Sequence, residues 1–119
     1  MVLMSPLADA VLPMIRTRSE LHRYGAANAH GREMHEAVDI LEAAIPTTDP
    51  TEIYAVTQKA LASSLKVIAR ADDSSGIIGD ACRRLLELHP RAAAAARTPV
   101  AKLVDWMLKQ KNIAAVLVY

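Results

Sequence analysis

Residues 49–71 read DPTEIYAVTQKALASSLKVIARA, and this stretch gives the clearest indication of the fold. Asp49 is suited to cap a helix, Pro50 fits its first position, and Glu52 completes a capping box. The apolar residues that follow, with one serine among them, recur at helical spacing: Ile53, Val56, Ala60, Leu61, Ser64, Leu65, Val67 and Ile68. Such a broad face predicts a central helix, ending near Ala71, that contacts neighbours on two sides.

A first helix is expected near the N-terminus. Ser5 followed by Pro6 is typical of a helix start, and apolar residues recur at helical spacing through residues 7–24. Pro13 should either kink this helix or mark its true beginning. Gly25 should end it.

A second helix is predicted over residues 31–44, after a short connection at residues 26–30 and before a stop at Pro46. One apolar stripe should face the core: Met34, Val38, Leu41 and Ile45. A separate polar face should meet solvent: His35, Asp39 and Glu42.

The C-terminal half begins with a turn at residues 72–76, DDSSG, which is rich in capping side chains. A fourth helix is expected over residues 77–89, and Pro90 should break or restart it before a short Ala-rich piece at residues 91–97. His22 and His89 are expected near helix C-termini, where a histidine favours the helix dipole.

Thr98–Pro99 repeats the cap-then-proline signal and predicts a last helix to about Lys111. The apolar segment 113–119 should then extend that helix, fold back on the core, or form a strand against a partner. The whole pattern predicts an all-α fold: a single domain over residues 1–119, built as a compact bundle of about five helices or as a solenoid-like helical fragment.

Composition excludes several classes of function. The 119 residues are 52% apolar with no Phe. The net charge of +1 does not suggest a polyanion binder. The N-terminal third is nevertheless slightly basic through Arg16, Arg18, Arg23 and Arg32. Cys82 is the single cysteine, so an internal disulfide and a multi-cysteine zinc site are excluded, and a buried core thiol is expected. We expect a cytoplasmic protein without a signal peptide or a membrane span.

No catalytic, metal or nucleotide motif is present, and no cofactor or metal is predicted. Gly76 and Gly79 lack the lysine of a phosphate loop, and the aspartates of this turn lack the spacing of a calcium loop. Trp106 either closes the edge of the core or contributes to an interface. The candidate partner or ligand contacts are Asp72, Asp73, Ser75, Gly76, Gly79, Asp80, Trp106, Val116 and Tyr119.

Part of the chain resembles a known family. The resemblance covers about residues 61–110 and rests on the segments 69–82 (ARADDSSGIIGDAC), 85–89 (LLELH) and 99–107 (PVAKLVDWM). These segments resemble the helical region that accompanies SWIM zinc fingers in uncharacterised bacterial proteins. That region implies a helical fold but no activity. SWIM fingers bind nucleic acid or protein through a Cys/His-bound zinc, and this chain lacks those ligands.

Three functions follow as hypotheses. The first is a protein-interaction module that self-associates as a homodimer, because reaction chemistry is lacking and the segment 113–119 is apolar. Deleting that segment should change the oligomeric state without unfolding the domain. The second is a nucleic-acid-associated accessory domain, and the third is an enzyme or small-ligand binder that uses the turn from Asp72 to Asp80.

Overall fold

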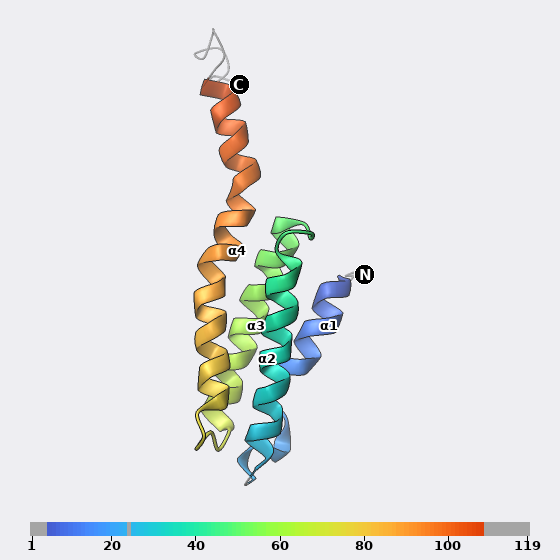
Figure 1. Cartoon of the computed structure of the whole chain (residues 1–119), viewed down its shortest axis with the longest axis vertical. Coiled ribbons are helices and arrows are strands. Elements are labelled where there is room, and N and C mark those ends of the chain that lie inside the picture. Colours follow the sequence, from blue (N-terminus) through green and yellow to red (C-terminus); the bar gives the residue numbers. More distant parts are fainter. Residues whose placement is uncertain (1–4, 24, 109–119) are drawn as a thin grey trace.

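The computed structural model describes residues 5–23 and 25–108, with side chains described as far as Ala94 (Figure 1). These residues form α1 (Pro6–Ile15), the 3₁₀ helix η1 (Ser19–His22), α2 (Ala26–Ala44), α3 (Pro50–Arg70) and α4 (Ile77–Leu108). No strand occurs in these ranges, so the predicted all-α fold is confirmed, with four α-helices where about five were expected.

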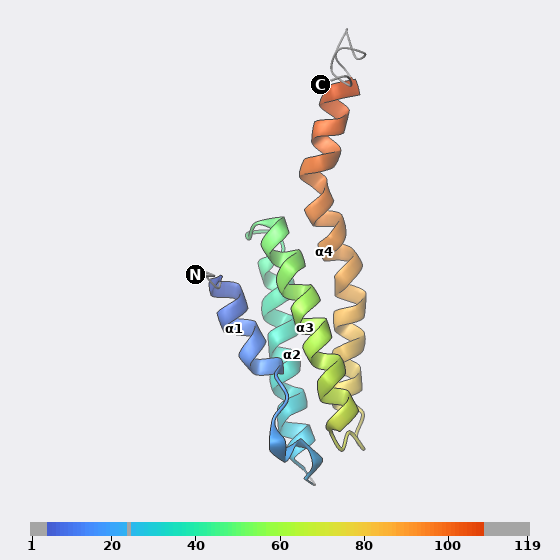
Figure 2. The same cartoon turned by 180° about the vertical axis from the view of Figure 1, so that it is seen from behind.

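The helices pack as a bundle in which α3 contacts both α1 and α4, while α2 also contacts α1 and α4 (Figures 1 and 2). The broad face of α3 therefore has neighbours on two sides, as predicted. The largest fully buried apolar side chains come from every helix: Val11, Ile15, Leu21, Met34, Val38, Leu41, Ile53, Val67, Ile78, Leu85 and Leu88. Each contributes about 1.5–3 kcal/mol of burial free energy, which holds the four helices together.

The N-terminal region differs from the prediction of one helix to Gly25. α1 already ends at Ile15, and Pro13 lies inside it rather than at its start. The chain then turns through η1, so that Leu21 is buried in the core. Gly25 does not end a helix; with φ of +84° it is the N-cap of α2, and the expected connection at residues 26–30 is helical.

The prediction of a helix break at Pro90 and a new start at Thr98–Pro99 is wrong, because α4 is one helix of 32 residues. Leu88 and Ala92, on either side of Pro90, are both buried, and this packing holds the helix in one piece. The alanines that follow Pro90 have the highest intrinsic helix propensity, which further offsets the hydrogen bond that the proline removes. His89 consequently lies within α4 and not at a helix end, with its ring 5.4 Å from that of Tyr54.

Candidate functional site

The turn between α3 and α4 is organised around Asp73. Its carboxylate accepts hydrogen bonds from the backbone N–H groups of Ile78 (2.9 Å) and Gly79 (2.8 Å). These groups at the start of α4 have no partner within the helix, and a negative charge is favoured there. A Cβ at Gly79 would lie 3.3 Å from the Asp73 carboxylate, which gives a physical reason for glycine at this helical position. The carboxylate of Asp73 thus caps α4.

The other polar residues of this turn fasten it to neighbouring elements. Ser75 donates a 2.6 Å hydrogen bond to the side-chain oxygen of Asn28 in α2. The backbone N–H of Asp72 donates to the Leu21 carbonyl at the end of η1 (3.1 Å). Gly76 has a φ of +77°, which other residues rarely adopt. The structure therefore gives each of these predicted ligand contacts a role in closing the turn.

Asp80 leads to a second group of polar residues, between α2 and α4. It pairs with Arg83 one turn further along α4, and its carboxylate lies 3.8 Å from Nε2 of His35. That nitrogen lies 3.2 Å from the Ile77 carbonyl, and Nδ1 of the same ring lies 2.9 Å from a guanidinium nitrogen of Arg84. A neutral His35 that donates from Nε2 and accepts at Nδ1 satisfies both contacts.

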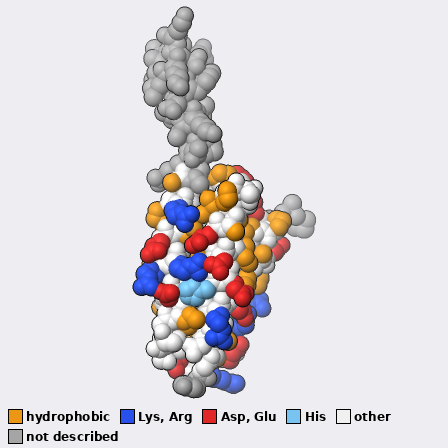
Figure 3. Space-filling model, viewed as in Figure 1, with side chains coloured by type: hydrophobic (Ala, Val, Ile, Leu, Met, Phe, Trp, Pro, Cys, Tyr) orange, Lys and Arg blue, Asp and Glu red, His pale blue; other side chains and the backbone are white. Residues whose placement is uncertain are grey.

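Arg84 is the centre of this group. Its guanidinium donates to Asp39 (2.6 Å) and to Glu42 (3.5 Å), as well as to the ring and the backbone carbonyl of His35. The hydrogen bond with Asp39 is the main reason why the pKa of Arg84 lies above its usual value. Figure 3 shows basic, acidic and histidine side chains gathered on this face. His35, Asp39 and Glu42, which were expected to meet solvent, thus bind an arginine of α4.

This polar group is a clamp between two helices. The donors of Arg84 are directed at α2, and the part of the chain with described side chains holds no cluster of three or more His, Cys, Asp or Glu placed to bind a metal. Cys82 is buried as predicted, 3.5 Å from the Ser64 carbonyl, and burial raises the pKa of its thiol. A thiol in this state is a weak nucleophile.

Replacing Arg84 with glutamine should destabilise the protein by about 1–2 kcal/mol, because a charge-assisted contact between α2 and α4 is lost and the carboxylates of Asp39 and Glu42 are left without a cation. Urea unfolding monitored by circular dichroism measures this difference. Arg83→Gln is the matched control, since Arg83 is exposed and its ion pair with Asp80 lies along its own helix. An equal effect of the two substitutions would refute the clamp.

A different feature is the second half of α4. Buried residues of this helix extend from Ile78 to Ala92, where it packs against α2 and α3. Beyond them the helix continues to Leu108 and projects past the ends of α2 and α3, with no other described helix beside it (Figures 1 and 2). Trp106 belongs to this projecting segment, whereas Val116 and Tyr119 lie outside the described residues. The expected break at Pro90 concealed this projection from sequence reasoning.

No family model matches the chain, and neither a curated protein nor a solved structure is found to be similar to it. The resemblance to the SWIM-associated helical region therefore stays a prediction. In the described part of the chain, no helix combines the length and the apolar character that crossing a membrane requires.

Proposed function

We propose that this protein is a helical interaction module that self-associates through the projecting segment of α4, residues 95–108. The observation that supports this most strongly is the continuity of α4 beyond the bundle. A segment of 14 helical residues is about 21 Å long, and helices of this length are marginal in water without a packing partner. A partner for this segment has to come from outside the described chain.

The sequence of this segment has the spacing of a helix that packs on one side. Its larger apolar residues recur at intervals of one, three and four positions: Val100, Leu103, Val104, Met107 and Leu108. In a continuous helix, positions 100, 103 and 107 keep the phase of positions 78, 85 and 92, which are buried in the bundle. The apolar side of α4 thus extends past the helices that cover its first half.

A second copy of the chain is the partner that fits this pattern. In an antiparallel pairing centred between Leu103 and Val104, position 100 of one copy stands opposite position 107 of the other. The same register places Leu103 of one copy beside Val104 of the other at the centre of the contact. A two-fold pairing therefore matches apolar with apolar residues along the segment.

Sedimentation velocity over a series of protein concentrations tests the proposal. The wild-type chain is expected to form a dimer, and Leu103→Glu should weaken it by at least about a hundredfold, since a charge is placed in the contact twice. Thr98→Glu is the matched control: it adds the same charge to the same helix, but position 98 lies about 140° around the helix from position 103 and away from the apolar positions, so the dimer should persist.

The register has its own test. Val100→Glu and Met107→Lys should each weaken the dimer, and the double variant should restore it, because this register places position 100 of one copy opposite position 107 of the other and thus pairs the two new charges. A wild-type chain that remains monomeric at every concentration would overturn the proposal. Equal weakening by the control and by Leu103→Glu would remove α4 as the interface.

A further inference from the structure

A small cavity opens between the chain that follows α1, the 3₁₀ helix η1 and the end of α3. Its volume is about 340 Å³, and the residues that line it are Thr17, Arg18, Ser19, His22 and Arg70. Each of these side chains offers a hydrogen-bond donor, and no carboxylate is among them. The cavity thus joins two guanidinium groups, an imidazole and two hydroxyl groups from segments that are distant in the sequence.

Arg18 is held in place at one side of the cavity. Its two terminal nitrogens contact the two carboxylate oxygens of Glu33 in α2, at 3.3 and 2.9 Å. This paired contact uses two of the five N–H donors of the guanidinium and fixes its plane. The remaining donors are available to a ligand without a further loss of side-chain freedom, which favours binding.

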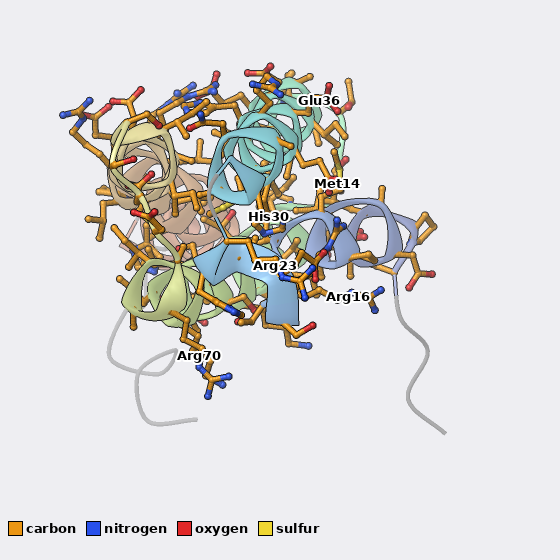
Figure 4. All side chains as sticks on the ribbon, turned by 90° about the horizontal axis from the view of Figure 1, so that it is seen from below. Met14, Arg16, Arg23, His30, Glu36 and Arg70 are labelled. Carbon is orange, nitrogen blue, oxygen red and sulfur yellow. The ribbon has the colours of Figure 1, made fainter. Side chains whose placement is uncertain are left out.

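Arg70 lines the cavity from the last turn of α3. It is exposed and has no ion-pair partner among the residues whose side chains are described. Figure 4 shows Arg70 at the end of its helix and labels two further arginines, Arg16 and Arg23, on the segments that flank η1. Both are exposed as well, so the positive charge around the cavity is only partly balanced by Glu20 and Glu33.

We propose that this cavity binds the phosphate group of a small phosphate monoester. A dianionic tetrahedral group accepts hydrogen bonds on several sides, and guanidinium and hydroxyl donors are the groups that recognise it. A cavity of this size holds such a group together with part of a sugar-sized molecule. An extended nucleic-acid backbone fits less well, because Glu20 and Glu33 flank the site and the net charge of the whole chain is only +1.

The experiment is a titration of the ¹⁵N-labelled chain with ribose 5-phosphate at constant ionic strength, followed by amide chemical shifts. The amides of residues 17–22 and of Arg70 are expected to shift and to saturate in the millimolar range. Arg70→Gln should weaken the binding at least about tenfold, through the loss of one charged donor. Arg91→Gln, which removes an exposed arginine from α4, should leave the binding unchanged.

Two further ligands distinguish the source of the phosphate. Ribose should produce no saturating shift, because it lacks the anionic group. A single-stranded oligonucleotide without a terminal phosphate should bind more weakly per phosphate than ribose 5-phosphate. Shifts that do not saturate, that appear equally with ribose, or that survive Arg70→Gln overturn the proposal. Binding of the oligonucleotide alone overturns it in favour of a nucleic-acid surface.

Discussion

Replacement of Gly31 with alanine is expected to destabilise the protein by about 1–2 kcal/mol, although alanine is the better helix former. Gly31 lies in α2 where the start of α4 comes closest to it. A Cβ at this position would lie 2.5 Å from Cγ2 of Ile77 and 3.0 Å from its Cγ1. The Cβ of Ile77 itself would lie 3.2 Å away, and a β-branched side chain has one strongly preferred χ1 in a helix, so the clash is relieved only by an unfavourable rotamer or by a shift of the α4 backbone. This strain exceeds the gain of about 1 kcal/mol in helix propensity.

Urea unfolding of four chains measures the effect: wild type, Gly31→Ala, Ile77→Ala and the double variant. Ile77→Ala removes the two carbons that the new methyl group would meet most closely. In that background Gly31→Ala should be neutral or stabilising, which gives a coupling free energy of at least about 1 kcal/mol. Equal destabilisation in both backgrounds would show that the close approach of α2 and α4 is not the cause.

Local patterns in the sequence were sufficient to predict the all-α fold class and the position of α3 in the chain. The proline at position 50 and the apolar spacing after it place this helix within one residue of its observed end. The predicted capping box did not form, since the side chain of Asp49 makes no capping hydrogen bond. The helix starts there nevertheless, because Pro50 and the burial of Ile53 are enough to fix its beginning.

Tertiary packing determined the features of the fold and of the polar contacts that the sequence pattern did not predict. Pro13 and Pro90 both lie inside helices, where buried residues on either side maintain the helical backbone. Packing also determines the partners of the polar residues: Asp39 pairs with Arg84 from another helix, and that contact depends on how the helices pack. The cavity beside η1 was missed for this reason, because Arg18 and Arg70 are far apart in the chain.

Acidification should destabilise the bundle through His30. This residue of α2 is 2% exposed, and neither of its ring nitrogens has a hydrogen-bond partner. Burial lowers its pKa below the usual 6.5, and this effect outweighs that of the nearby Ile15 carbonyl, which raises it. Among the charged groups that act on the ring, Arg18 lowers the pKa while Glu33 and Glu20 raise it. The imidazole is therefore neutral in the folded protein at neutral pH.

The direction of the pH effect follows from this lowered pKa. As the pH falls below about 6.5, the unfolded chain takes up a proton at His30 while the folded chain does not. The free energy of unfolding then decreases with falling pH, by at most about 1.4 kcal/mol for each pH unit, until the folded protein is protonated as well. Above about pH 7.5 both states are neutral at this position, and the contribution disappears.

Urea unfolding of the wild type and of His30→Met is measured at about pH 7.5 and at about pH 5.5. The difference between the two chains separates the contribution of His30 from that of the other titrating groups. Methionine fills a similar volume without the two unpaired nitrogens, so this variant should be at least as stable as the wild type at the higher pH. Its loss of stability on acidification should be smaller by up to about 1.4 kcal/mol. His22→Gln, at an exposed histidine, is the control for the loss of a histidine from the surface. If His30→Met loses as much stability in acid as the wild type, the acid sensitivity resides in the surface charges and not in this buried ring.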